Sequence, residues 1–506
     1  MRLSKLLNGI TSYSSKDIPD QEIEGLVYDS REVRPGFMFV ALKGCTQDGH
    51  AFIKDAINKG AVTVVGESFK RESGVYENVN VVQVADSRKA LSKLAENFYG
   101  NPSKGLNLIG ITGTNGKTTT SYLLESILLA SGAKPGVIGT INYRSPEQKW
   151  EAHVTTPESL ELMQTLRRMA DSGVTDVVME VSSHALDQGR VEGCPFRIAV
   201  FTNISRDHLD YHGSMQEYFE AKSRLFRGLR KNGTGDKARS VINGDDPKGK
   251  DLEKLTDVPV VTYGLGRGCD VRASLIQSTR TGLTATLVTP ADEMEIRSSL
   301  IGDFNIYNIL AASAAAMCMD IEPNAIVSGI AQLKGVPGRL ELVENRRSLT
   351  VLVDYAHTPD ALKKALIAIK SLVEKGRLIT VFGCGGDRDK GKRREMGYAA
   401  GEHSDVVFIT SDNPRSEDPA VIISQIEEGI QESGLKKLED LSGGRPPGPG
   451  YILDPDRRNA IRKAVEMADK TDLILIAGKG HEDYQIIGKD KRHFDDREVA
   501  VEAASR

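Results

Sequence analysis

The sequence has little cysteine and no paired cysteine motif. Its five cysteines (Cys45, Cys194, Cys269, Cys318 and Cys384) are scattered through 506 residues, and none stands in a CxxC pair. An odd and dispersed set argues against a disulfide framework or a zinc site, and it favours a reducing, cytoplasmic environment. We therefore expect these thiols to act as small buried hydrophobic groups.

Long apolar runs and a strong net charge are also missing. The longest apolar stretch, residues 309–319, is too short to span a bilayer and is better suited to a buried alanine-rich helix. The first ten residues lack the long apolar run of a signal peptide. A net charge of −4 gives no reason to expect a nucleic-acid or acidic membrane surface. We expect no nucleic-acid partner, no membrane insertion and a monomer.

The chain is longer than a domain with a single hydrophobic core usually is, and its length indicates two to four domains. Pro, Gly and Ser cluster at residues 99–105 and again at 335–341, as in linkers. Residues 441–450, rich in Gly and Pro, are typical of a flexible surface insertion. The predicted domains are 1–100, 101–336 and 337–506.

Apolar runs alternate with helical patterns through the second and third of these segments. The runs at 108–112, 177–181 and 198–204 are typical of parallel strands buried on both faces, and helical patterns lie at 158–171 and 214–229. The third segment repeats the alternation, and its apolar runs end in polar or glycine-rich residues, where ligands gather in a doubly wound sheet. We predict an α/β fold with a small N-terminal α/β domain, a central P-loop-type parallel-sheet domain and a C-terminal Rossmann-like domain.

Residues 110–118, GITGTNGKT, lie between a predicted strand and a predicted helix. Glycines let the backbone turn its N–H groups inward, the helix N-terminus adds a positive field, and a lysine reaches the terminal phosphates of a nucleotide. The usual phosphate loop has glycine where this chain has Ile111. The alternative is a tight turn with a solvated lysine. The candidate ATP-binding residues here are Gly113, Thr114, Asn115, Gly116, Lys117, Thr118 and Thr119.

This loop resembles that of the Mur ligase family, the ATP-dependent amide-forming enzymes of cell-wall precursor synthesis. The N-terminal segment supports the resemblance more weakly, through YDSREVRPGFMFVALKG at 28–44. The other motifs that carry it are VTTPE (154–158), MEVSSHALDQGRV (179–191), NISRDHLDYHG (203–213), EAKSRLF (220–226), GDFNIYN (302–308), GRLE (338–341), VDYAHTPDAL (353–362), GCGGDRDKGKR (383–393), SDNPRSEDP (411–419) and GKGHEDYQ (478–485).

The resemblance implies a mechanism in which the ATP γ-phosphoryl group moves to a substrate carboxylate and an amine attacks the acyl phosphate. Such chemistry depends on positioning and on neutralising crowded oxygens. Thr118 and Glu180 would bind Mg²⁺, and His208 would serve a second Mg²⁺. Lys222 would carry CO₂ as a carbamate, which needs a neutral amine and hence a lowered pKa. Without the resemblance, Glu180 and His208 are surface hydrogen-bonders and Lys222 is a solvated helix lysine. Lys117, Lys222 and His208 are the catalytic candidates.

Further binding residues follow from the same resemblance. Asn305, Arg339 and Asp354 would contact ATP, with Tyr355 and His357 nearby, although strand-end capping is the alternative for these residues. Hydroxyls and an amide suit uracil, sugar and peptide groups, and an arginine suits a carboxylate or phosphate. The residues implied for the UDP-N-acetylmuramoyl dipeptide are Ser30, Thr155, Thr156, Ser182, Gln188 and Arg190.

The segment DNPR (412–415) resembles members that add meso-diaminopimelate rather than lysine. Diaminopimelate carries a second amino-acid head whose carboxylate lysine lacks, and Arg415 can clamp that carboxylate with two parallel hydrogen bonds. Asp412 and Asn413 can meet the adjacent ammonium. The alternative is a plain turn that opens a helix. The implied pocket consists of Arg388, Asp412, Asn413, Arg415, Gly478 and Glu482.

Three rival functions remain open at this point. A lysine-adding ligase of the same family is disfavoured by Arg415. A folylpolyglutamate-type ligase shares the loop and the reaction, but it leaves the N-terminal segment and DNPR unexplained. A P-loop switch or transport ATPase would leave the strand-end clusters without a role.

Overall fold

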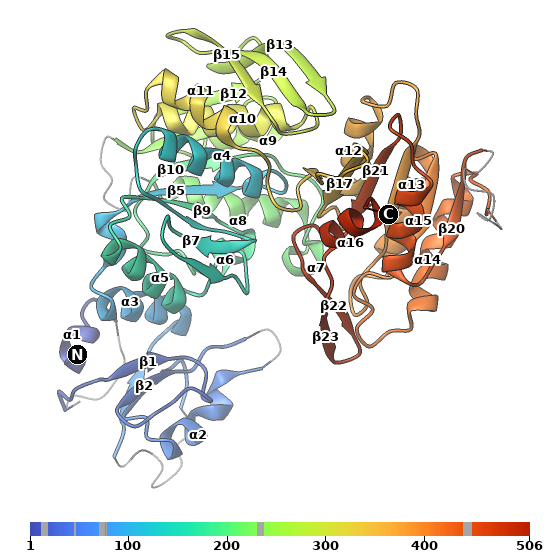
Figure 1. Cartoon of the computed structure of the whole chain (residues 1–506). Coiled ribbons are helices and arrows are strands. Elements are labelled where there is room, and N and C mark those ends of the chain that lie inside the picture. Colours follow the sequence, from blue (N-terminus) through green and yellow to red (C-terminus); the bar gives the residue numbers. More distant parts are fainter. Residues whose placement is uncertain are drawn as a thin grey trace. The chain divides into compact units, whose positions relative to one another are not determined.

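The computed structural model describes residues 1–11, 19–44, 47–69, 76, 78–229, 237–438 and 448–505. Cys45 and residues 441–447 of the Gly/Pro-rich stretch therefore lie outside the described residues. The predicted α/β class is confirmed (Figure 1). The chain forms two compact units: residues 1–262 with 314–320, and residues 263–313 with 321–506. The three-domain boundaries drawn from the sequence stay a prediction.

The first unit opens with a small parallel sheet, whose strand order is β1-β2-β3-β4. Its short strands are apolar and largely buried, as the runs FMFV and TVVG indicate. Helix α3 starts after Asp86, whose carboxylate accepts hydrogen bonds from the backbone N–H groups of Arg88 and Lys89. These two donors of the first turn would otherwise have no partner within the helix. The elements are α1 (Leu3–Leu6), β1 (Gly25–Val27), β2 (Phe37–Val40), α2 (Ile53–Asn58), β3 (Thr63–Gly66), β4 (Asn80–Gln83) and α3 (Ser87–Phe98).

A larger, mostly parallel sheet of the same unit carries the phosphate loop, and its edge strands β7 and β8 pair antiparallel. Strand β5 lies in its middle and pairs in parallel with both β9 and β10. Its order within this unit is β11-β10-β5-β9-β6-β7-β8. Helices α4 and α8 contact β5. The elements are β5 (Asn107–Thr112), α4 (Lys117–Ala130), β6 (Pro135–Ile138), β7 (Asn142–Arg144), β8 (Lys149–Glu151), α5 (Ser159–Asp171), β9 (Asp176–Glu180), α6 (Ser183–Asp187), β10 (Phe196–Phe201), α7 (Leu209–His212), α8 (Met215–Arg227), β11 (Arg239–Asn243) and α9 (Pro247–Glu253), and the unit boundary falls inside β12 (Val260–Gly264).

The second unit begins with the antiparallel strands β13 (Val271–Thr279), β14 (Gly282–Val288) and β15 (Glu293–Ser298). Two helices follow, α10 (Asn305–Met317), whose residues from Ala314 on belong to the first unit, and α11 (Pro323–Gln332). The apolar stretch at 309–319 falls mostly in α10, where Ile309, Leu310 and Ala311 are fully buried. The expectation of a buried alanine-rich helix is confirmed.

The rest of the second unit is a doubly wound sheet of order β16-β17-β21-β18-β19-β20. Alternate residues of β17 face opposite sides, so Leu352 packs with α12 to α14 while Val351 and Val353 pack with α15 and α16 (Figure 1). The elements are β16 (Glu341–Leu342), β17 (Thr350–Asp354), α12 (Pro359–Lys370), β18 (Leu378–Phe382), α13 (Gly391–His403), β19 (Val406–Ile409), α14 (Pro419–Glu432), β20 (Gly450–Leu453), α15 (Arg457–Glu466), β21 (Leu473–Ala477), β22 (Tyr484–Ile487), β23 (Asp490–His493) and α16 (Asp496–Ala503).

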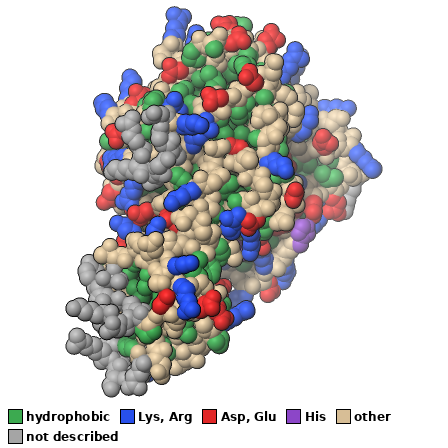
Figure 2. All heavy atoms as spheres, turned by 90° about the vertical axis from the view of Figure 1, so that its left-hand side faces the viewer, with side chains coloured by type: hydrophobic (Ala, Val, Ile, Leu, Met, Phe, Trp, Pro, Cys, Tyr) green, Lys and Arg blue, Asp and Glu red, His purple; other side chains and the backbone are tan. Residues whose placement is uncertain are grey.

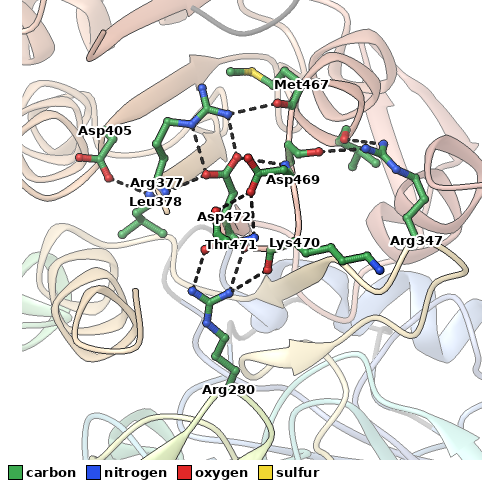
Figure 3. A network of polar contacts seen from close by, with 12 residues as sticks. Arg280, Arg347, Arg377, Leu378, Asp405, Met467, Asp469, Lys470, Thr471 and Asp472 are labelled. Carbon is green, nitrogen blue, oxygen red and sulfur yellow. Dashed lines mark hydrogen bonds and ion pairs between the residues drawn. The ribbon is translucent and has the colours of Figure 1, made fainter. Parts of the chain in front are cut away.

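Three arginines satisfy backbone carbonyls near the start of β21 (Figure 3). Arg347 donates to the carbonyls of Val465 and Ala468 at the end of α15. Arg377 pairs with the buried Asp472 at 2.7 Å. Arg280, from the turn between β13 and β14, donates to the carbonyls of Leu372, Lys470, Thr471 and Asp472. Helix ends and turns leave such carbonyls without backbone partners, and the guanidinium groups supply the missing donors.

The surface and the thiols agree with most of the expectations from composition. On the face drawn in Figure 2, basic and acidic side chains are interspersed. No helix among the described residues has the length and apolar character needed to cross a membrane. No disulfide links the four described cysteines to one another. Cys194 and Cys384 are buried as expected, whereas Cys269 and Cys318 are only half-buried.

A buried ion pair ties α15 to α16. Arg457 and Asp496 are both fully buried, with 2.7 Å between the guanidinium and the carboxylate. We expect Arg457→Met to lower the free energy of unfolding by about 3–5 kcal/mol, because it leaves a buried carboxylate unpaired. The midpoint of urea unfolding measures this change.

The neighbouring Arg458→Met variant is the matched control, because the Arg458–Glu502 pair is about half exposed (54% and 53%). An exposed pair contributes about 0–1 kcal/mol. Equal shifts in the two variants would contradict the assignment of a structural role to the buried pair.

Candidate active site

The phosphate loop connects β5 to α4 in the first unit. Gly113 (φ +150°) and Gly116 (φ +89°) adopt backbone angles that favour glycine. Helix α4 begins at Lys117, so the N–H groups of its first turn are available to an anion. The Lys117 ammonium donates to the carbonyl oxygens of Gly113 and Thr114 at 2.8 and 2.9 Å. The alternative of a solvated lysine is wrong, since Lys117 folds over the loop.

Residues after β10 hold the loop in place, and the sequence analysis did not identify them. Asn203 donates to the carbonyl of Asn115 and accepts from its N–H, at 3.1 and 3.0 Å. The Thr202 hydroxyl donates to the same carbonyl at 2.6 Å. Thr119 and Thr118 are buried in the first turn of α4. Polar residues directly after an apolar run on a neighbouring parallel strand were the available signal.

A buried carboxylate lies beside the loop. Glu180, at the end of β9, is 1% exposed and accepts from the Thr118 hydroxyl at 2.9 Å. Its carboxylate also accepts from the N–H and the hydroxyl of Thr140, at 3.0 and 2.9 Å. The alternative of a surface hydrogen-bonder is wrong for Glu180. A carboxylate and a hydroxyl are the hard oxygen donors that Mg²⁺ prefers, so this pair fits that ion. Thr140 was missed, although it follows β6 at the same edge of the sheet.

Lys222 is a buried lysine on α8. Its side chain is 2% exposed, and its ammonium donates to the carbonyl of Gly113 at 2.9 Å. It also lies 4.3 Å from the centre of the Tyr218 ring. Burial and the neighbouring Lys117 lower the pKa of Lys222 well below its usual value. The alternative of a solvated helix lysine is wrong. A neutral amine at this position is compatible with the carbamate that the family resemblance implies.

His208 takes a left-handed backbone conformation (φ +53°) at the start of α7. Its ring lies 4.8 Å from that of His184 and 6.2 Å from that of Tyr218. The His208 side chain is 47% exposed, which agrees with the alternative of a surface residue. Partial burial lowers the pKa of His208, Asp207 opposes that shift, and the charges of Lys117 and Lys222 add to it. No three His, Cys, Asp or Glu side chains of the described residues converge as a metal site.

Five of the six residues predicted to bind the uridine substrate form one cluster. The Thr156 hydroxyl accepts from the Ser182 N–H at 3.0 Å, and Arg190 donates to the carbonyl of Thr156 at 3.0 Å. Arg190 also donates to the Gln188 amide oxygen at 2.6 Å. The Thr155 hydroxyl meets that of Thr140 at 3.1 Å, next to Glu180. Ser30 is instead buried after β1, where its carbonyl accepts a hydrogen bond from the Lys59 ammonium.

In the second unit, Asp354 lies at the end of β17. Its carboxylate accepts from the N–H groups of Leu340 and Ala356, both at 2.7 Å. The strand-end capping that the sequence left open is thus present. Burial raises the pKa of Asp354, and the nearby Arg339 opposes that shift. The Arg339 guanidinium lies 4.7 Å from the centre of the Tyr355 ring. Asn305 is buried at the start of α10 and donates to the carbonyl of Ile301 at 2.8 Å.

A second cluster of polar side chains, which we take as the candidate amino-acid pocket, lies at the carboxyl ends of β19 and β21. Asn413 donates to the Glu482 carboxylate at 3.0 Å and accepts from the Ile486 N–H at 2.9 Å. Asp412 is buried, and a Cβ at Gly478 (φ +113°) would lie 2.8 Å from its carboxylate. Burial and the charge of Asp412 raise the pKa of Glu482.

Two arginines approach the same pocket. Arg415 (φ +51°) donates to the carbonyl of Gly386 at 2.7 Å. A Cβ at Gly385 would meet Arg415 at 3.0 Å and Arg388 at 3.8 Å, so both side chains border this loop. Arg388 is otherwise exposed and donates to the carbonyl of Asp387. A turn follows this segment, in which the Glu417 N–H donates to the Pro414 carbonyl at 3.0 Å, and α14 begins at Pro419, so the alternative of a turn before a helix stays open.

Buried Arg393 supports the pocket from α13 and was missed. It pairs with Glu417 at 2.9 Å and donates to the carbonyl of Gly385 at 3.2 Å. These contacts lower the pKa of Glu417 to about 2. The GCGGDRDKGKR motif contains Arg393, but only the fold shows that it points inward.

A phosphate loop with a buried carboxylate beside it, and polar pockets at parallel strand ends, define a nucleotide-dependent α/β enzyme. Three family models match the chain: "Mur ligase family, catalytic domain" at 22–99, "Mur ligase middle domain" at 111–316 and "Mur ligase, glutamate ligase domain" at 338–480. The chain belongs to the Mur ligase family.

Curated relatives match over the full length. A protein of Geobacter metallireducens named UDP-N-acetylmuramoyl-L-alanyl-D-glutamate--2,6-diaminopimelate ligase is 49% identical, covering 99% of this chain and 98% of that protein. A protein of the same name from Geobacillus thermodenitrificans is 45% identical with the same coverage. A solved structure of that name is 34% identical, with a TM-score of 0.68 and 97% of each chain covered. Folylpolyglutamate synthase of Mycobacterium tuberculosis shares only the fold, at 19% identity, a TM-score of 0.59 and coverage of 81% of this chain and 93% of that chain.

The close approach at Gly113 generates a prediction. A Cβ at this position would overlap the Thr202 hydroxyl and lie 3.0 Å from the Asn203 N–H. We expect Gly113→Ala to weaken ATP binding about 10- to 100-fold, because the loss of one charge-assisted hydrogen bond costs about 1.5–3 kcal/mol. Isothermal titration calorimetry measures the affinity. Gly105→Ala is the control, since a Cβ there meets nothing within 4 Å. ATP affinity that is unchanged in Gly113→Ala would exclude this loop as the nucleotide site.

Proposed function

We propose that this enzyme uses ATP to join meso-diaminopimelate to UDP-N-acetylmuramoyl-L-alanyl-D-glutamate in peptidoglycan precursor synthesis. The observation that carries the proposal is full-length identity of up to 49% to curated relatives of that name. The polar pocket around Asp412, Asn413 and Glu482 supports it, because that pocket is suited to an amino-acid head.

The reaction begins at the terminal carboxylate of the dipeptide. Its oxygen attacks the γ-phosphorus of ATP, ADP leaves, and an acyl phosphate forms. The amine of the donor then attacks the acyl carbon, phosphate departs with the C–O bonding electrons, and the amine loses a proton. Bound Mg²⁺ would neutralise the phosphate charge, which contributes several kcal/mol of transition-state stabilisation. Water must stay away from the acyl phosphate, since hydrolysis would waste it.

The first unit supplies residues for the phosphoryl group. Lys117 would hold the γ-phosphate, and the N–H groups of residues 113–119 would surround the others. Thr118 and Glu180 would hold one Mg²⁺, and His208 with Lys222 as a carbamate would hold a second. Asn305, Arg339 and Asp354 are proposed as further nucleotide contacts.

The cluster of Thr155, Thr156, Ser182, Gln188 and Arg190 is proposed to bind the UDP-N-acetylmuramoyl dipeptide, together with Ser30. The hydrogen bonds that already link Arg190 to Gln188 and Thr156 support this assignment, because they fix the guanidinium before a ligand binds. Such preorganisation lowers the entropic cost of binding. We place the reaction in the cytoplasm and expect a monomer that serves cell-wall growth, cell shape and cell division.

Diaminopimelate would bind in the pocket of the second unit. Arg415, with Arg388 beside the same loop, is suited to its distal carboxylate. Asp412, Asn413 and Glu482 are suited to its distal ammonium, and Gly478 leaves space beside Asp412. Lysine lacks the distal carboxylate and would leave the Arg415 guanidinium without an anion.

The decisive experiment supplies ATP, Mg²⁺, the UDP-dipeptide and one amino acid from a panel. We expect the UDP-tripeptide mass to appear with meso-diaminopimelate, at a rate at least about 100-fold above that with L-lysine, since a site left with an unpaired polar group rejects the wrong substrate strongly. Phosphate release should require both substrates. Phosphate release without either substrate would favour the ATPase switch, and faster turnover of lysine would favour the lysine-adding ligase.

The buried Lys222 generates a second prediction. We expect Lys222→Ala to lower kcat at least about 100-fold, because the loss of an anionic metal ligand removes several kcal/mol of charge stabilisation. Acetate should restore part of the activity by supplying a carboxylate in the space of the carbamate. Arg227→Ala on the same helix is the control, since its pair with Glu220 is exposed. Active enzyme in ¹³C-labelled CO₂ should show a carbamate NMR signal, and its absence would rule out the modification.

A further inference from the structure

We propose that Lys479 sets the net charge of the amino-acid pocket in the second unit and thereby selects a zwitterionic head over a lone ammonium group. This inference rests on the proposed function, because it concerns the residue that discriminates between amine donors at the same site. Lys479 was not among the residues that the sequence analysis singled out.

Lys479 is a fully buried lysine at the centre of the pocket. Its ammonium lies 3.2 Å from the Asn413 amide oxygen, and 3.7 Å from both the Asp412 and the Glu482 carboxylates. It also lies 5.5 Å from the centre of the Tyr484 ring. A buried ammonium is stabilised only when anions or dipoles face it, and here two carboxylates do so.

The backbone around Lys479 holds it in this position. It stands between Gly478 and Gly480, both with positive φ. A Cβ at Gly480 would lie 2.7 Å from the Tyr355 Cβ, so the turn packs closely against the segment after β17. The buried Arg457 donates to the carbonyl of Ala477 at 3.0 Å, just before the turn. Lys479 therefore belongs to a rigid part of the pocket.

The buried and half-buried charges grouped around Lys479 sum to zero. Asp412 and Glu482 contribute two negative charges, and Lys479 and Arg415 contribute two positive charges. The exposed Arg388 on the loop after β18 lies outside this group. Arg415 acts on both Glu482 and Tyr484 electrostatically, so it belongs to the same group. A zwitterionic head is itself neutral and offers each side chain an opposite charge. The ω-ammonium of lysine would instead add an uncompensated positive charge.

Lys479 also helps Glu482 to remain an anion. Burial and Asp412 raise the pKa of Glu482, and Lys479 acts in the opposite direction. Without Lys479, two neighbouring carboxylates would face each other with less compensation, which would attract a cation more strongly. The substitution Lys479→Met removes the charge while keeping a long apolar side chain.

The test is a competition between equal concentrations of meso-diaminopimelate and L-lysine, in which mass spectrometry measures the ratio of the two UDP-tripeptides. This ratio reports the relative kcat/KM of the donors. We expect Lys479→Met to lower the diaminopimelate-to-lysine product ratio by about 30-fold or more. Lys479→Arg, which retains the charge, should keep the ratio within about threefold of the wild type. The KM for ATP should stay unchanged in both variants.

A double variant distinguishes an electrostatic role of Lys479 from a purely structural one. In Lys479→Met/Glu482→Gln the net charge returns to zero, so the product ratio should rise again toward the wild-type value even where the overall rate is low. A purely structural role of Lys479 would lower both products together and leave the ratio unchanged, which would overturn the proposal. If Lys479→Met does not fold, the single variant Glu482→Gln decides: it raises the net charge of the group by one, so the diaminopimelate-to-lysine product ratio should rise above the wild-type value, and an unchanged ratio would overturn the proposal.

The failure of the proposed function would look different. Wild-type enzyme that makes neither tripeptide, or that makes the lysine product preferentially, would refute the assignment of the substrate. Wild-type enzyme that prefers diaminopimelate, with an unchanged ratio in Lys479→Met, would refute only the role of Lys479. Arg415→Ala removes the other positive charge of the pocket, and the diaminopimelate-to-lysine product ratio of this variant should also fall.

Discussion

The site of the first unit depends on the carbonyl oxygen of Gly113, which accepts hydrogen bonds from two lysine side chains. Lys117 and Lys222 donate to it at 2.8 and 2.9 Å. Two ammonium groups on one oxygen repel each other, and Lys222 has lost its hydration as well. The pKa of Lys222 falls for these two reasons. A phosphate anion or a carbamate at this point would relieve the repulsion, which makes the arrangement well suited to phosphoryl transfer.

That carbonyl is positioned by the pairing of parallel strands. Strand β5 ends between β9 and β10, so Glu180 and Thr202 reach the loop from either side. Because parallel strands bring their carboxyl ends to one edge, residues far apart in sequence meet there. The close packing leaves no room for a side chain at Gly113. The loop geometry is thus a consequence of the sheet as much as of its own glycines.

The second unit also gathers polar groups at the carboxyl ends of its parallel strands, but these groups differ in kind from those of the first unit. Its pocket gathers acidic, basic and amide groups after β19 and β21, and buried ion pairs support it from outside. Arg393 and Glu417 hold the loop after β18, while Arg457 and Asp496 hold the end of β21. Such pairs stabilise the fold less than their distances suggest, because burying charges costs hydration. Their contribution here is to fix the loops that carry the recognition groups.

The sequence by itself determined the fold class and the chemical types at the site. The alternation of apolar runs predicted the α/β sheets, and GITGTNGKT predicted a phosphate loop, since these features depend on local spacing. The family resemblance placed Glu180, Arg190 and Asn413 among the site residues, and the structure brings each of them beside other candidates. Ser30 lies after β1 instead, where its carbonyl accepts a hydrogen bond from Lys59.

Only the tertiary structure decided which side chains are buried together. Lys222 is indistinguishable in sequence from a solvated helix lysine, because burial depends on how α8 packs against β5. Thr140 carries no signal of its own beyond lying near a strand end, and the motifs that contain Asn203 and Lys479 do not show which residues they contact. Their partners are remote in sequence, so their roles follow from strand order and register. Local pattern therefore fixed the kinds of chemistry available, and the pairing of distant strands decided which residues perform it.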